Sequence, residues 1–232
     1  MDSSAQLAAI GDRAAAEIAD GSVVGLGTGS TAEAMIRALG ARVAAGLQVT
    51  GVATSNRTIA LATSLNIPLT TLDAVDRLDL CIDGADEIDA NVDVVKGKGG
   101  ALLFEKLVAR QADRYLIIAS AEKLVARLGT RLPLPVEIVP LGWKATERAV
   151  AALGVHPVLR RHEDSAPYVT DGGHWILDCD APTGGFPDPT ALAAALKATV
   201  GVVDHGFFLG MADLALTIDD TGTITETARP TA

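Results

Sequence analysis

Short apolar runs alternate with amphipathic segments along the first half of the chain, and this alternation restricts the fold more than any other feature. The runs of strand length cover residues 23–26, 47–53, 78–82 and 115–119, and segments with helical spacing cover residues 7–18, 31–39, 57–65 and 101–112. Continuously apolar strands that alternate with helices are typical of a parallel sheet covered by helices. The sequence therefore predicts an α/β fold with a mostly parallel sheet.

The pattern changes after about residue 131, where prolines interrupt a stretch that is expected to be extended. Helical spacing follows at residues 144–153 and 189–199, and strand-like runs follow at 155–160 and 175–179. This order predicts a small α+β domain of the split βαβ kind. The apolar run 214–218 is expected to return to the first sheet, and the tail after Gly222 to form a short edge or to fray. The predicted domains are residues 1–132 with 210–232, and residues 133–209.

Composition excludes several kinds of partner. At a net charge of -10 the chain has no broad basic face for nucleic acid or anionic lipid, so an anionic ligand needs a local site. No segment approaches the roughly 18 uninterrupted apolar residues of a membrane span. The two cysteines, Cys81 and Cys179, lack the spacing of a metal site or a disulfide framework. We expect a cytoplasmic protein that binds neither nucleic acid nor membranes.

Residues 25–31, Gly-Leu-Gly-Thr-Gly-Ser-Thr, join a predicted strand to a predicted helix. A dinucleotide-binding fingerprint needs a third glycine where Ser30 stands and an acidic residue near Val49, and the sequence has neither. The glycines let the backbone approach a ligand, and the hydroxyls of Thr28, Ser30 and Thr31 suit an anion at the start of a helix. The loop predicts a phosphate site, and the alternative is a tight turn rich in helix-capping residues.

Four acids, Asp83, Asp86, Glu87 and Asp89, directly follow the apolar run 78–82. The carboxyl ends of parallel strands are where open α/β sheets place their sites. A solvated turn or a divalent-cation loop would also account for these acids, although the spacing of a calcium helix-loop-helix is absent.

Residues 96–106 then bring together a lysine, a glycine-rich loop and a glutamate. The glycines leave backbone N–H groups available, Lys96 supplies a positive charge, and Glu105 supplies a base. These are the groups needed to remove a proton beside a carbonyl and to stabilise the resulting enediolate. Lys98 and Lys106 are weaker candidates, because a lysine beside glycine or on a helix face is usually solvated.

These segments resemble the A-type ribose-5-phosphate isomerase family along nearly the whole chain. The matching blocks are residues 25–31, 54–58, 83–89, 96–106, 134–140 and 201–213. The resemblance implies a Rossmann-like domain with a small inserted ferredoxin-like lid, a homodimer or a tetramer, and no metal or organic cofactor. It also implies interconversion of D-ribose 5-phosphate and D-ribulose 5-phosphate through an enediolate, in the non-oxidative branch of the pentose phosphate pathway.

The resemblance assigns a role to each matching residue. Glu105 would be the base that moves the proton between C1 and C2, Asp83 and Asp86 would assist ring opening and handle hydroxyl protons, and Lys96 would lie near the developing oxyanion. Lys123 would hold the phosphate with the hydroxyls of the first glycine-rich loop. The implied substrate-binding residues are Gly27, Thr28, Gly29, Ser30, Thr31, Ser55, Gly97, Lys98, Gly99, Gly100 and Lys123.

One departure from the family pattern concerns the phosphate. The family often has a lysine on the first helix, yet the region around Ala8 and Ala9 has none, and Lys96 is the first lysine of this chain. Arg57 or Lys98 would then supply the missing positive charge.

Two other functions fit a fold of this kind. An amino-sugar phosphate deaminase or a lactonase is expected to have a histidine near its carboxylates, and no histidine precedes His156. A non-catalytic sugar-phosphate sensor or a CoA-transferase-like binding module does not need a base such as Glu105. The presence of Asp83, Asp86 and Lys96 together with Glu105 favours the isomerase.

Overall fold

The computed structural model describes residues 3–230, which form two compact units. Unit 1 contains the residues up to 85, residues 104–123 and the residues from 210 onward, and unit 2 contains residues 86–103 and 124–209. Unit 2 thus takes in residues 86–103 and 124–132, which the sequence predicts as part of the larger domain.

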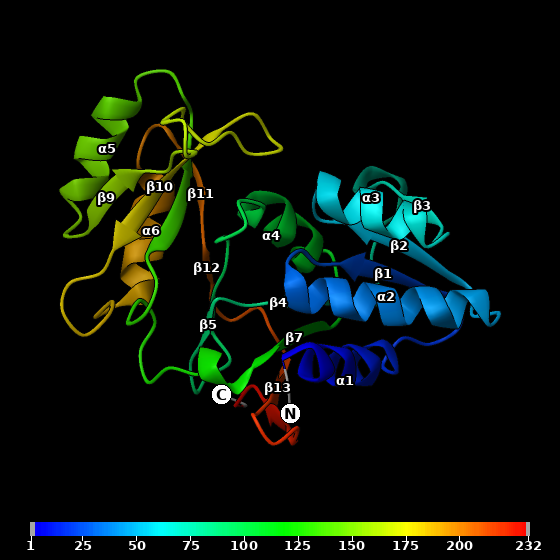
Figure 1. The fold of residues 1–232 in the computed structure, drawn as a ribbon. Coiled ribbons are helices and arrows are strands. Elements are labelled where there is room, and N and C mark those ends of the chain that lie inside the picture. Colours follow the sequence, from blue (N-terminus) through cyan, green and yellow to red (C-terminus); the bar gives the residue numbers. More distant parts are fainter. Residues whose placement is uncertain (1–2, 231–232) are drawn as a thin grey trace. The chain divides into compact units, whose positions relative to one another are not determined.

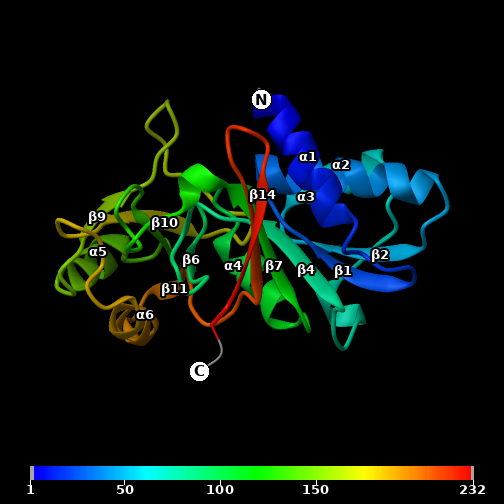
Figure 2. The same cartoon turned by 90° about the horizontal axis from the view of Figure 1, so that it is seen from below.

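A seven-stranded sheet forms the centre of unit 1, with the strand order β14-β13-β7-β4-β1-β2-β3. All neighbouring strands are parallel except β13 and β14, which confirms the predicted mostly parallel sheet. The tail after Gly222 forms the antiparallel edge strand β14, drawn in red in Figure 2. The strands are β1 (Ser22–Leu26), β2 (Val49–Ala53), β3 (Leu69–Thr70), β4 (Leu80–Gly84), β7 (Tyr115–Ser120), β13 (Leu214–Ile218) and β14 (Ile224–Ala228).

Helices cover both faces of this sheet. Helices α1 (Ser3–Ala15) and α2 (Ser30–Ala44) lie side by side (Figure 1), and their apolar side chains share a core with Val24 and Leu26 of β1. Side chains alternate along a strand, so Gly25 faces the other way. A carbon added at Gly25 would lie 2.7 Å from Cγ1 of Val108, so α4 covers the face opposite to α1 and α2. The remaining elements are α3 (Asn56–Ser64), α4 (Leu102–Arg110), and the short 3-10 helices η1 (Leu72–Ala74) and η2 (Ala121–Lys123).

Unit 2 contains a four-stranded antiparallel sheet with the order β11-β8-β10-β9. The chain order strand, helix, strand, strand, helix, strand confirms the expected ferredoxin-like arrangement. A second, three-stranded sheet has the order β12-β6-β5. The elements are β5 (Glu87–Ile88), β6 (Val94–Val95), β8 (Leu134–Ile138), α5 (Trp143–Ala151), β9 (His156–Leu159), β10 (Trp175–Asp180), α6 (Pro189–Ala198), β11 (Val202–His205) and β12 (Phe207–Phe208).

Candidate active site

The turn after β1 lies directly against the end of β4, where the first predicted catalytic acid stands. The Gly27 N–H donates to the Ile82 carbonyl at 2.9 Å. A carbon added at Gly27 would overlap the Asp83 carboxylate and lie 2.6 Å from the Asp83 Cα. Glycine is therefore required at position 27, because no side chain fits between the ends of the two strands.

Two backbone amides fix the Asp83 carboxylate. Its Oδ1 accepts hydrogen bonds from the Thr28 N–H at 3.0 Å and from the Gly84 N–H at 2.7 Å. The side chain is fully buried at the carboxyl end of β4. Hydrogen bonds from backbone N–H groups to a carboxylate are charge-assisted and hold its orientation. The glycine-rich loop thus contributes to the site by orienting Asp83.

We expect Gly27→Ala to lower kcat/KM by about 10²-fold or more, because the new methyl group must displace Asp83 and a small misplacement can cost this much. Overpacking should also destabilise the fold by about 1–3 kcal/mol. Steady-state kinetics and thermal unfolding test both effects. Wild-type kinetics in Gly27→Ala would show that the Asp83 position is not critical.

Glu105 lies on α4 and is 4% exposed. Val108, one turn later, faces Gly25 and Cys81, so residues 105 and 108 share the face of the helix that covers the sheet. Alternation along β4 places Asp83 on the same face of the sheet as Cys81. Both carboxylates therefore lie on one side of the sheet of unit 1.

The charges of both carboxylates, Asp83 and Glu105, affect the pKa of the Tyr115 phenol. Tyr115 begins β7 and pairs with Cys81 of β4. Burial first, and then the charges of Asp83, Cys81 and Glu105, hold the pKa of the Tyr115 phenol well above its ordinary value. Tyr115 stays a neutral phenol near the two acids, and no motif in the sequence points to it.

The Thr28 hydroxyl belongs to a cluster of four hydroxyls. Its Oγ1 donates to Ser55 Oγ at 2.8 Å and lies 2.8 Å from Thr54 Oγ1. Ser55 caps the start of α3, because its Oγ accepts the Thr58 N–H at 3.1 Å. The Thr58 hydroxyl in turn donates to the Gly27 carbonyl at 2.8 Å. The Ser55 hydroxyl therefore already has a structural role, because it accepts hydrogen bonds from Thr28 and Thr58. Its contact with a ligand stays a prediction.

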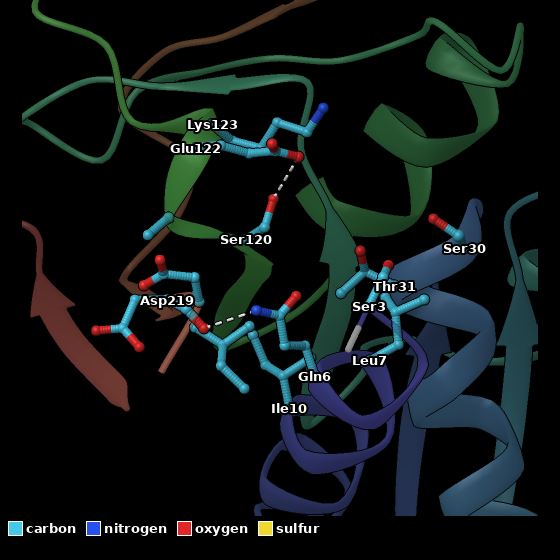
Figure 3. Close-up of a pocket in the computed structure, with 13 residues that line it drawn as sticks. Ser3, Gln6, Leu7, Ile10, Ser30, Thr31, Ser120, Glu122, Lys123 and Asp219 are labelled. Atoms are coloured by element: carbon cyan, nitrogen blue, oxygen red, sulfur yellow. Dashed lines mark hydrogen bonds between the residues drawn. The ribbon is translucent and has the colours of Figure 1, made fainter. Parts of the chain in front are cut away.

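A cavity of about 570 Å³ brings together three of the predicted phosphate contacts, Ser30, Thr31 and Lys123 (Figure 3). Gln6 of α1 also lines it and donates from Nε2 to the Asp219 carbonyl at 2.9 Å. Lys123 is the one basic side chain among the lining residues, beside three acids. The lining residues are Ser3, Gln6, Leu7, Ile10, Ser30, Thr31, Ser120, Ala121, Glu122, Lys123, Ile218, Asp219 and Asp220.

Neither of the cations suggested as a substitute for the missing first-helix lysine lines this cavity. The Arg57 guanidinium is largely exposed and pairs with Glu33. Lys98 belongs to unit 2.

In unit 2, the second glycine-rich loop adjoins Asp86 and Lys96. The Asp86 N–H donates to the Val95 carbonyl at 2.8 Å, and Asp86 Oδ2 accepts the Lys98 N–H at 2.9 Å. Lys96 is 3% exposed, and its Nζ lies 5.7 Å from the centre of the Phe208 ring. The loop brings Lys96 and Asp86 together within unit 2.

Comparison with known proteins identifies the family. Residues 50–222 match the model of the family "Ribose 5-phosphate isomerase A (phosphoriboisomerase A)". The chain belongs to this family. The ribose-5-phosphate isomerase A of Roseiflexus castenholzii is 54% identical over 207 residues, which cover 88% of each chain.

Solved isomerases support the same assignment. The ribose 5-phosphate isomerase A of Methanocaldococcus jannaschii superposes with a TM-score of 0.92 at 33% identity, over 98% of this chain and 100% of that one. A D-ribose-5-phosphate isomerase in complex with phospho-erythronic acid superposes with a TM-score of 0.94 at 32% identity, over 99% of this chain and 100% of that one. The family and the α/β fold expected from the sequence are confirmed.

The other acids of this isomerase's 83–89 segment have structural contacts. Glu87 is fully buried and accepts the Arg131 N–H at 2.7 Å, and Asp89 accepts the Asn91 N–H at 2.9 Å. No group of three or more His, Cys, Asp or Glu residues within 3–230 is arranged to hold a metal ion.

Lys106, which the sequence predicts to be solvated, is 8% exposed, because it lies on the buried side of a short helix.

Proposed function

We propose that this chain interconverts D-ribose 5-phosphate and D-ribulose 5-phosphate, with Glu105 as the base. Glu105 takes the proton from C2 of the open-chain aldose, and the electron pair of that bond moves toward the C1 carbonyl to form an enediolate. Returning the proton to C1, while the proton of the C2 hydroxyl passes to the oxygen on C1, gives the ketose, so no atom is gained or lost. The observation that supports this best is the pair of buried acids, Glu105 and Asp83, on one face of the unit 1 sheet.

The other members of the proposed catalytic set transfer the hydroxyl protons and stabilise the negative charge of the enediolate. Asp83 and Asp86 assist ring opening and accept or return the hydroxyl protons. Lys96 stabilises the oxyanion of the enediolate, a role in which a fixed positive charge is most effective when water is excluded. Lys96 is itself almost fully buried, which supports this role.

The cavity lined by Ser30, Thr31 and Lys123 is proposed to hold the phosphate. Hydroxyls, one cation and the start of α2 are suitable groups for an anion. The related isomerase in complex with phospho-erythronic acid supports a phosphorylated ligand. Binding the phosphate away from the reacting carbons would orient the sugar at Glu105. The loop residues Gly27, Gly29, Gly97, Gly99 and Gly100, with Thr28, Ser55 and Lys98, complete the proposed binding set.

Turnover of ribose 5-phosphate in the presence of a chelator tests the function. We expect ribulose 5-phosphate to form at an unchanged rate with chelator, and free ribose to react with a kcat/KM lower by about 10³-fold or more, because the phosphate supplies binding energy. Absence of turnover on ribose 5-phosphate would favour a sensor or another sugar phosphate as ligand. Efficient turnover of free ribose would contradict the proposed role of the phosphate cavity.

Further expectations from the sequence remain proposals. A homodimer or tetramer, a cytoplasmic location, activity without metal or organic cofactor and a lid formed by residues 133–209 follow from the family resemblance. No helix in the described part of the chain is both long and apolar enough to cross a bilayer.

A further inference from the structure

Two side chains from the ferredoxin-like part of unit 2 hold the loop at residues 96–100. Arg160, which directly follows β9, donates from Nη1 to the Gly97 carbonyl at 3.1 Å and to the Lys98 carbonyl at 3.0 Å. The Tyr168 hydroxyl donates to the Gly99 carbonyl at 3.1 Å. Three consecutive carbonyls of the loop are thus bound by side chains that have no part in the proposed reaction.

The guanidinium of Arg160 is itself fixed. Asp178 of β10 accepts hydrogen bonds from Arg160 Nε at 2.9 Å and from Nη2, so the planar fork has one orientation. The guanidinium also lies 5.6 Å from the centre of the Tyr168 ring. Only 14% of the Arg160 side chain is exposed, which reduces competition from water for these contacts. A surface ion pair without such contacts would contribute little.

The segment that presents Tyr168 is anchored to the central strand β8. The Tyr168 N–H donates to the Arg160 carbonyl at 3.0 Å. Two residues later, the Thr170 hydroxyl donates to Glu137 Oε1 at 2.8 Å, and His174 Nδ1 lies 3.0 Å from the same oxygen. Glu137 is 1% exposed. Tyr168 therefore approaches the loop from a segment that hydrogen bonds hold to Arg160 and Glu137.

The loop fits this support closely. A carbon added at Gly100 would overlap the Tyr168 hydroxyl, and Gly97 and Gly100 have φ values of 101° and 84°. Both values lie in the left-handed region that favours glycine. The Lys96 N–H donates to the Gly206 carbonyl at 2.8 Å, so Lys96 is held on one side by Gly206 and on the other by the bound loop.

We propose that Arg160 and Tyr168 are positioning residues for the isomerisation. They hold the loop so that Lys96 keeps its place, and so that the Lys98 N–H keeps its hydrogen bond to Asp86. This inference rests on the proposed function, because it acts through Lys96 and Asp86. On this proposal, the ferredoxin-like part of unit 2 has a second role besides that of a lid. It keeps Lys96 and Asp86, two members of the proposed catalytic set, in place.

Arg160→Lys tests the proposal, since lysine keeps the charge but cannot pair with Asp178 and reach two carbonyls at once. We expect kcat to fall by about 10- to 10²-fold while KM changes by less than about threefold, because displacement of a catalytic group affects the transition state most. Hydrogen exchange at residues 97–100 should become faster, with the rest of the chain unchanged. Arg161→Lys is the control, because Arg161 is exposed and contacts the Ser165 carbonyl instead.

A double variant separates positioning from general stability. If Arg160 acts through Lys96, then adding Arg160→Lys to Lys96→Ala should lower kcat by less than about threefold further, since coupled residues are not additive. Tyr168→Phe should speed exchange at the same loop even if Arg160→Lys fails to fold. Unchanged kcat in Arg160→Lys and Tyr168→Phe, or full additivity in the double variant, would overturn the proposal. An inactive wild type would instead reject the proposed function.

Discussion

Glu105→Gln should lower kcat by about 10³-fold, within the range of about 10² to 10⁴ that a positioned base contributes. The amide of glutamine has nearly the shape of the carboxylate but cannot accept the C2 proton. KM should stay close to that of the wild type, because the phosphate cavity is unaltered. Steady-state kinetics of ribulose 5-phosphate formation measure the effect. Deuterium uptake from solvent at C1 of the product, followed by NMR, should be lost in parallel.

The control for this change is Glu163→Gln, because Glu163 is exposed in unit 2. Its kinetics should match the wild type. Thermal unfolding of Glu105→Gln shows whether the fold is intact. Residual activity above about a tenth of the wild-type kcat in a folded Glu105→Gln protein would transfer the role of base to another group, and Asp83 would be the first candidate.

Lys96→Ala should lower kcat by about 10²- to 10³-fold and raise KM much less. Loss of one group that stabilises a developing oxyanion typically costs about 3–4 kcal/mol. The buried Nζ of Lys96 can provide such stabilisation because little water competes with it. Kinetics at saturating and limiting ribose 5-phosphate separate kcat from KM.

The matched control is Lys144→Ala, which removes an exposed lysine that lies over the Trp143 ring on α5. It should leave the kinetics unchanged. A large rise in KM with kcat preserved in Lys96→Ala would assign Lys96 to substrate binding in the ground state.

The elements of the fold could be predicted from the sequence because their signals are local. Apolar runs and helical spacing indicate the strands and helices of unit 1, and the prolines near residue 131 indicate the change to a second architecture. The order of the strands could not be predicted in this way. Strand β1 lies between β2 and β4, while β7 pairs with β13, and such pairing depends on contacts between distant parts of the chain.

The candidate site was predictable where glycines and charged residues are close in sequence. The loop at residues 25–31 and the acid at position 83 adjoin each other, as their positions after neighbouring strands suggest. Gln6 and Arg160 were not singled out, because the cavity and the loop that they contact are formed by residues far away in sequence. The sequence predicts a solvated Lys106 because lysines on helix faces usually are, and the nine residues of α4 are too few to reveal which side is buried.

The place of β13 in the sheet has a consequence for synthesis on the ribosome. The Tyr115 N–H donates to Asp213 across a sequence separation of 98 residues, and Leu216 and Ile218 of β13 complete the core of unit 1. Because a chain is synthesised from its N-terminus onward, all residues of unit 2 leave the ribosome before β13 can pack into the core of unit 1. A nascent chain that ends before residue 210 would leave β7 as an open edge, a form that chaperones would have to protect from aggregation.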